Sequence, residues 1–134
     1  MLSDPPRLFR TLVISSTAAY LIWFFHLLLV GSLISTATWD ILSWVGHGAL
    51  LPMPPSFAWL WMLLSVAVTV GLCAFSKSAR LVFALLTLFS ALITLLSGLQ
   101  VETAFGSFCL FIANLADGGI LLMAYTSPLK ERFA

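Results

Sequence analysis

Long apolar stretches alternate with short polar segments along the whole chain. Three stretches contain no Asp, Glu, Lys or Arg, and a fourth contains a single acidic residue, Asp117. A helix that crosses the hydrocarbon core of a bilayer needs about 20 apolar residues. The stretches are continuous and rich in Leu and Ala, without the alternation of a membrane barrel strand. We therefore predict an all-α, integral membrane four-helix bundle that forms one transmembrane domain over residues 1–134. The predicted spans are about 11–35, 57–75, 81–99 and 104–126.

Proline and the short connections refine this prediction. The second stretch is too long for one helix, and proline blocks helix continuation, so the second span begins after Pro52, Pro54 and Pro55. Residues 76–80 and 100–103 leave room only for tight turns, so we expect spans two, three and four to be consecutive antiparallel neighbours. The first span is longer than the core of a signal peptide, and we expect it to be retained.

The first outer loop, residues 36–56, is the only substantial connection. Thr38 followed by Trp39–Val45 predicts a short helix that is capped by Thr38 and ends at Gly46 or Gly48. Indole rings favour the headgroup region, so this helix is expected along the outer membrane interface, with Trp59 and Trp61 of span two at the same level. It is either an anchor that sets helix tilt or a lid and docking surface. The candidate contact residues in this loop are Trp39, Asp40, Trp44 and His47.

Small and polar residues recur on one face of each predicted span. Lipid offers no hydrophobic drive between helices, so such residues mark the faces on which helices pack. We therefore expect these faces to point into the bundle, and packing alone explains them. Apolar residues interrupt each stripe, which argues against conduction along them. The stripes are Ser15, Ala19 and His26; Ala58, Ser65, Thr69 and Cys73; Thr87, Ser90, Thr94 and Ser97; and Ser107, Asn114, Asp117 and Tyr125.

Composition agrees with this pattern and excludes several classes of protein. Hydrophobic residues make up 61% of the chain and charged residues 8%, whereas a soluble domain is about a quarter charged. The hydrophobicity excludes intrinsic disorder. A net charge of +1 without a basic patch makes nucleic acid an unexpected partner.

The basic residues predict the orientation. All six Lys and Arg residues fall in the segments that four spans place on one side of the membrane. Basic residues close to span ends remain cytoplasmic. We therefore expect both termini to be cytoplasmic, and the bacterial inner membrane is the expected compartment.

Asp117 is the residue that packing alone does not explain. A carboxylate near the bilayer centre costs about 2.5–3.5 kcal/mol on insertion scales. It should therefore face the bundle interior and have a partner. Asn114 lies three residues earlier, and His26 lies near the middle of span one, so we predict a buried cluster of Asp117, Asn114 and His26 with spans one and four in contact. Such a cluster is a structural clasp, a proton-handling site or a substrate-recognition site.

No cofactor is expected from the sequence. A bis-His haem site requires two histidines at similar depth, and His26 is deep whereas His47 lies in the outer loop. No metal-ligand spacing and no catalytic constellation are visible, so an enzyme is not expected. We predict a non-enzymatic subunit or scaffold of a larger membrane complex, in contact with lipid and with other subunits or copies of itself. The alternative is a small transporter or permeation protein that uses Asp117 with His26 and Asn114.

Overall fold

The computed structural model describes residues 4–126 and 128–133, without the side chains of residues 29 and 30. The described residues form helices, turns and loops, and four helices are long and apolar enough to cross a membrane. The helices are α1 (Pro5–Val30), α2 (Thr36–Leu42), α3 (Pro55–Cys73), α4 (Lys77–Leu96) and α5 (Ala104–Thr126), with 3-10 segments η1 (Gly31–Leu33) and η2 (Pro128–Phe133).

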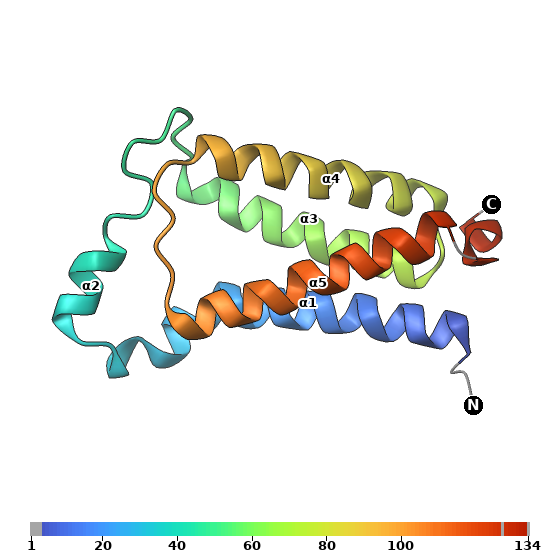
Figure 1. Ribbon diagram of the computed structural model, residues 1–134, viewed down its shortest axis with the longest axis horizontal. Coiled ribbons are helices and arrows are strands. Elements are labelled where there is room, and N and C mark those ends of the chain that lie inside the picture. The colour runs from blue at the N-terminus through green and yellow to red at the C-terminus, as the bar shows by residue number, and fades with distance from the viewer. Residues whose placement is uncertain (1–3, 127, 134) are drawn as a thin grey trace.

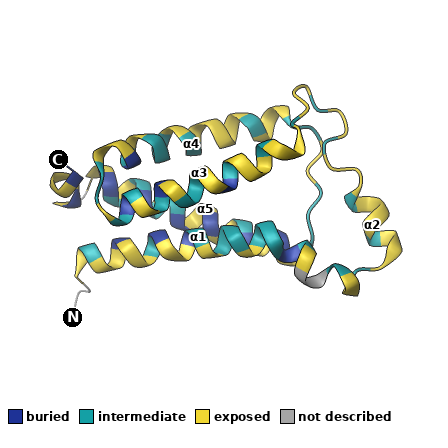
Figure 2. Cartoon of the chain, turned by 180° about the vertical axis from the view of Figure 1, so that it is seen from behind, coloured by how far each residue is buried: buried dark blue, intermediate teal, exposed yellow. Residues whose placement is uncertain are grey.

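The four long helices form two pairs, α1 with α5 and α3 with α4, and the pairs are joined by the packing of α1 against α3 (Figure 1). Both chain termini lie at the same end of the bundle as the α3–α4 turn, and we call this the terminal end (Figure 1). The opposite end carries α2 and the connection between α4 and α5, and we call it the loop end. The two pairs approach each other at the terminal end and diverge toward the loop end (Figures 1 and 2).

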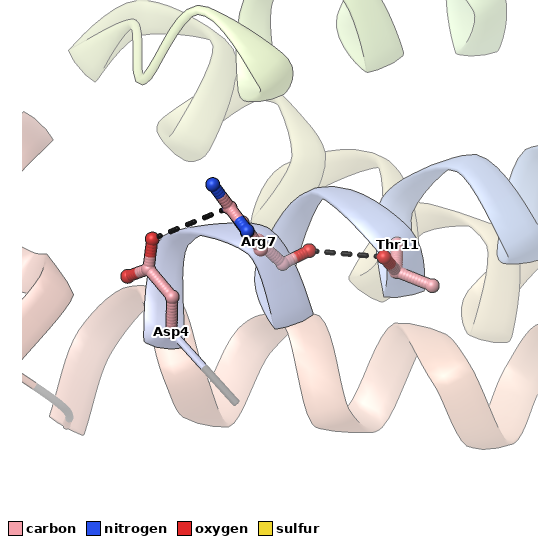
Figure 3. Close-up of polar contacts among 3 residues, drawn as sticks. All are labelled: Asp4, Arg7 and Thr11. Atoms are coloured by element: carbon pink, nitrogen blue, oxygen red, sulfur yellow. Dashed lines mark hydrogen bonds and ion pairs between the residues drawn. The ribbon is translucent and has the colours of Figure 1, made fainter. Parts of the chain in front are cut away.

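Helix α1 begins earlier than the predicted span. Asp4 precedes Pro5 at the first helical position, where the missing proline N–H is no loss. The carbonyl of Asp4 accepts the N–H groups of Arg7 at 2.9 Å and Leu8 at 3.0 Å. Figure 3 shows the Asp4–Arg7 ion pair, at 3.7 Å, and the Thr11 hydroxyl donating to the Arg7 carbonyl at 3.0 Å. The helix therefore starts before the predicted span of about 11–35, and it gives way to η1 at Gly31 before the predicted end.

Helices α3 and α4 also begin slightly before the predicted spans, whereas α5 coincides with the prediction. Pro55 occupies the first turn of α3. The helix therefore begins within the proline cluster, whereas the sequence predicted that it begins after it. Ser76 caps α4, and its hydroxyl accepts the N–H of Ala79 at 3.5 Å. The cap places Lys77 and Arg80 inside the first turn of α4.

The α1–α5 interface is the most extensive in the fold. The α5 side of this interface consists mainly of small residues at helical spacing, which allow the two backbones to approach closely. On α1, Phe9, Val13, Ser16 and His26 are buried. The buried residues of α5 are Gly106, Cys109, Ala113, Ala116, Ile120 and Ala124.

An apolar core fills the terminal end. The rings of Phe9, Phe75 and Phe133 pack against one another, with centroids 5.3–5.6 Å apart. Arg10 and Arg80 lie over these rings, at 5.1 Å from Phe75 and 5.3 Å from Phe133 respectively. Figure 2 shows buried positions gathered at this end. The rest of the core is Val13, Val68, Leu72, Ala79, Ile120, Ala124 and Leu129.

The connection between α4 and α5 crosses from one helix pair to the other. Extended chain spans up to about 3.3–3.6 Å per residue, so a short connection can bridge the gap. The expectation that spans three and four are packed neighbours is therefore wrong, since α5 packs mainly on α1. Backbone hydrogen bonds join this connection to the first loop. The Gly46 N–H donates to the Leu99 carbonyl at 2.8 Å, and the Leu99 N–H donates to the His47 carbonyl at 2.9 Å.

Gly98 is required at this crossing of the two loops. Its φ of 76° lies in the left-handed region. A Cβ on Gly98 would stand 2.6 Å from both the Ala49 nitrogen and the His47 carbonyl oxygen. No other residue type fits this conformation and this space together.

Candidate functional site

Asp117 lies on the side of α5 that faces α1, where Ser16 is its partner. The Ser16 hydroxyl donates to Asp117 Oδ1 at 2.5 Å. It also lies 3.5 Å from the Ala113 carbonyl oxygen, but its single proton serves the shorter contact. Ser16 is buried and Asp117 is half-buried. The carboxylate is thus oriented by α1 while part of it remains open to the space between the helices.

That space is a cavity of about 110 Å³ in the centre of the bundle. It is large enough for several water molecules, and its polar lining provides the partners that ordered water needs. All four long helices contribute residues to it. Its lining is Ser16, Thr17, Tyr20, Trp61, Ser65, Val68, Thr69, Phe83, Leu86, Thr87, Ser90, Leu110, Ala113, Asn114 and Asp117.

A hydroxyl pair on the cavity wall joins α1 to α3. Thr17 Oγ1 and Thr69 Oγ1 lie 2.6 Å apart. Each hydroxyl also lies 2.9 Å from a carbonyl of its own helix, Val13 for Thr17 and Ser65 for Thr69. Two hydroxyl protons cannot serve three contacts, so one threonine must release its intrahelical bond to donate to the other. Either the Thr17 or the Thr69 hydroxyl can therefore be the donor in the bond between them.

A larger pocket of about 420 Å³ adjoins the cavity toward the loop end. The two spaces share Tyr20, Trp61, Ser90, Leu110 and Asn114. The hydroxyl and amide side chains of this shared lining alternate with apolar residues such as Leu110, as the sequence predicts for the stripes. The remaining lining of the pocket is Trp23, Phe24, Phe57, Ala58, Ile93, Thr94, Gln100 and Glu102.

The described lining of these two spaces carries only negative formal charge. Asp117 stands in the cavity and Glu102 at the pocket, and no Lys, Arg or His lines either space. Among the described residues, no group of three His, Cys, Asp or Glu side chains is placed to hold a metal ion. The lining therefore favours a cation or a neutral solute over an anion.

Asn114 lies near Asp117 but is not its hydrogen-bond partner. It is exposed in the protein and lines both the cavity and the pocket. Within the described part of the chain, its amide makes no hydrogen bond. Asn114 therefore lies on the boundary that the two spaces share.

His26 belongs to a separate cluster at the loop end. Its Nδ1 contacts the Trp23 carbonyl, and its Nε2 lies 3.0 Å from Thr103 Oγ1. Thr103 precedes α5, and its hydroxyl accepts the Gly106 N–H at 3.0 Å. A carbonyl only accepts, so the tautomer with hydrogen on Nδ1 satisfies the network and Thr103 donates to Nε2. His26 thus fixes the start of α5 against α1.

The structure brings Asp117 and His26 onto the same interface but not together. Ser16, the partner of Asp117, precedes His26 by ten residues of α1, which is about 15 Å at 1.5 Å per residue. The sequence predicted His26 near the middle of the first span. Because α1 begins at Pro5, the midpoint of this helix lies well before His26. The predicted cluster of Asp117, Asn114 and His26 is therefore replaced by two clusters.

Glu102 accepts a hydrogen bond from Trp23 Nε1 at 3.1 Å and is half-buried. Both residues line the 420 Å³ pocket and a second space of about 580 Å³ beneath α2. A Cβ on Gly106 would stand 2.8 Å from Glu102 Oε2 and 2.9 Å from the His26 ring. The Trp23–Glu102 bond therefore stands between two spaces at the loop end.

The loop candidates lie apart from the central cavity. Ser35, and not Thr38, caps α2, which ends at Leu42. Trp39 packs against Gly31, and its Nε1 lies 3.4 Å from the Gly31 carbonyl oxygen. Asp40 is exposed. Trp44 and His47 are exposed as well, with ring centroids 5.8 Å apart.

The sequence did not predict the roles of several residues of the site. It placed Ser15 and Ala19 on the inward face of span one, whereas Ser15 is exposed and Ser16 is buried. It assigned Trp61 to the membrane interface, whereas Trp61 lines the cavity. A threonine before an apolar run is a capping signal, and it was available for Thr103.

Comparison of the chain with models of protein families, with curated protein sequences and with solved structures gave no match in any of the three. The geometry of the site is therefore the basis for the functional assignment.

Proposed function

We propose that the chain is a multi-pass membrane protein of the transporter or permeation class, in which Asp117 binds a proton or a small cation that enters from the loop end. One observation supports this proposal above the others: the cavity at Asp117 shares five lining residues with the larger pocket at the loop end. A structural clasp needs a buried and saturated carboxylate. The Asp117 carboxylate instead has one side-chain partner and borders the cavity, whose lining includes hydroxyl and amide side chains.

The proposed orientation places the terminal end in the cytoplasm, in a bacterial inner membrane. The elements that carry Arg7, Arg10, Lys77, Arg80, Lys130 and Arg132 meet at the terminal end. Basic residues are retained on the cytoplasmic side. The pocket then faces the opposite side, and the apolar core closes the cytoplasmic end in this conformation.

The test is flux into vesicles that contain the purified protein. The probes are protons, detected with a trapped pH-sensitive dye under a potassium diffusion potential, and labelled sodium and methylammonium ions. We expect the native chain to accelerate the flux of at least one probe, and Asp117→Asn to reduce that flux at least tenfold. Asp40→Asn is the matched control, because Asp40 is exposed on α2 and lines neither space.

Two outcomes would overturn the proposal. One is flux of all three probes equal to that of protein-free vesicles. The other is an equal effect of Asp117→Asn and Asp40→Asn. Asp117→Glu retains the charge with one more methylene and should retain part of the flux, which separates loss of the carboxylate from general misfolding.

A second candidate is the subunit or scaffold role, and the surface of α4 favours it. Within the described residues, Ala79 is the single buried position of α4. Leu81, Leu85, Leu88 and Leu92 are all at least half exposed on its outer side. Lipid or another transmembrane helix would cover such a surface. Purification in mild detergent followed by mass determination distinguishes them, since a defined complex with other chains favours this role.

A further inference from the structure

The two spaces at Asp117 are lined by aromatic rings as well as by polar groups. Tyr20 and Trp61 line both spaces, and Phe83 lines the cavity. Trp23, Phe24 and Phe57 line the pocket. A proton or a sodium ion is bound by oxygen atoms, so binding of either ion does not require aromatic rings.

The rings are held in place by one another. The Trp61 ring lies between those of Phe57 and Phe89, with centroids at 5.6 Å and 5.7 Å. The Tyr20 and Trp23 rings are 5.4 Å apart. A preorganised aromatic wall loses little conformational entropy when a ligand binds. Trp61 is therefore a fixed surface at the boundary between the cavity and the pocket.

Carboxylate and aromatic rings together recognise one chemical class. The faces of Trp and Tyr rings attract cations, and this attraction is used for quaternary ammonium ligands. Such cations are weakly hydrated, so they lose less than a metal ion on leaving water. The 110 Å³ cavity suits the charged group, and the 420 Å³ pocket lies within the range of sites for drug-sized molecules.

We infer that the site takes an organic cation with an aromatic or bulky apolar substituent, its charged group between Asp117 and the Trp61 and Tyr20 rings and its apolar part in the loop-end pocket. This inference rests on the proposed function and names its substrate class. Trp61 is assigned as the residue that distinguishes an organic cation from a metal ion.

The experiment is equilibrium binding by isothermal titration calorimetry on the purified full chain in detergent. The probe is benzyltrimethylammonium, compared with tetramethylammonium, with the neutral benzyl alcohol and with sodium ion. We expect benzyltrimethylammonium to bind at least tenfold more tightly than each of the other three. Asp117→Asn should weaken its binding at least tenfold.

The role of Trp61 is tested with matched tryptophan variants. Trp61→Leu should weaken benzyltrimethylammonium binding at least fivefold. Trp61→Phe keeps a ring and should restore most of the binding, which shows that the leucine variant did not fail by misfolding. Trp44→Leu removes an exposed indole that lines neither space, and it should have no effect.

The outcomes separate this inference from the proposed function. Equal affinity for benzyltrimethylammonium and benzyl alcohol, or equal effects of Trp61→Leu and Trp44→Leu, overturns the inference. If Asp117-dependent proton or sodium flux persists without binding of the organic cation, the inference fails and the proposed function stands. If the organic cation binds at Asp117 but no probe crosses the vesicle membrane, the binding site stands and transport is rejected.

Discussion

The terminal half and the loop half of the bundle are built from the same four helices but are held together differently. At the terminal end, nine buried apolar residues form a continuous core with Phe75 packed against it, and Arg10 and Arg80 lie over the rings of Phe75 and Phe133. Toward the loop end, the helix pairs diverge around the cavity and the pocket, and a few hydrogen bonds join them. Close packing of side chains therefore closes the terminal end, whereas looser packing leaves the loop end accessible.

This difference assigns different tasks to the two halves. A close-packed interior resists rearrangement because every displaced side chain loses contacts. Hydroxyl pairs such as Thr17 and Thr69 can exchange donor and acceptor roles at little cost. The terminal half is thus suited to stability and the loop half to binding, and substitutions should separate these two properties.

The largest expected effect is on stability at the terminal end. Phe9 is completely buried, and Phe→Ala at such a site costs about 3–5 kcal/mol. We expect Phe9→Ala to lower the free energy of unfolding by roughly 3 kcal/mol, measured by denaturant titration in detergent. Phe57→Ala, at the half-buried wall of the pocket, should cost less than half as much. Equal losses would remove the proposed distinction between the halves.

The next effect concerns the crossing of the two loops. Gly98→Ala introduces both a strained φ and a backbone clash, so we expect a loss of about 2 kcal/mol in the same titration. Gly48 has a similar φ of 72° but open space around its Cβ position. Gly48→Ala should therefore cost only about 1 kcal/mol. If the two variants behave alike, the contact between Gly98 and the first loop is not formed in solution.

The smallest expected effect is one of chemical accessibility. After Cys73 and Cys109 are replaced by Ala, Ser90→Cys places a thiol on the wall shared by the cavity and the pocket. We expect it to react with a charged maleimide at least ten times faster than Ala124→Cys, whose side chain lies in the terminal core. The reaction is followed by mass spectrometry in vesicles. Equal rates would show that the two halves are equally closed.

The sequence was sufficient for the number of long helices, but not for the rotation of α1 about its axis. Ser15, Ser16 and Thr17 are consecutive and span about 200° of the helix circumference, so composition does not reveal which of them faces inward. Only the packing of α5 selects Ser16. The depth of His26 was wrong because it depended on the start of α1, and Pro5 after Asp4 was a start signal that the apolar pattern did not contain.

The dominant pairing of α1 with α5 has a consequence for the biosynthesis of the chain. The first long helix leaves the ribosome well before the helix on which it packs, because α3 and α4 are translated between them. Until α5 arrives, Ser16 and His26 have neither of the α5-side groups that they contact in the finished fold. A nascent chain that stalls before residue 103 would therefore leave the side chains of Ser16 and His26 without the partners that they have in the finished fold.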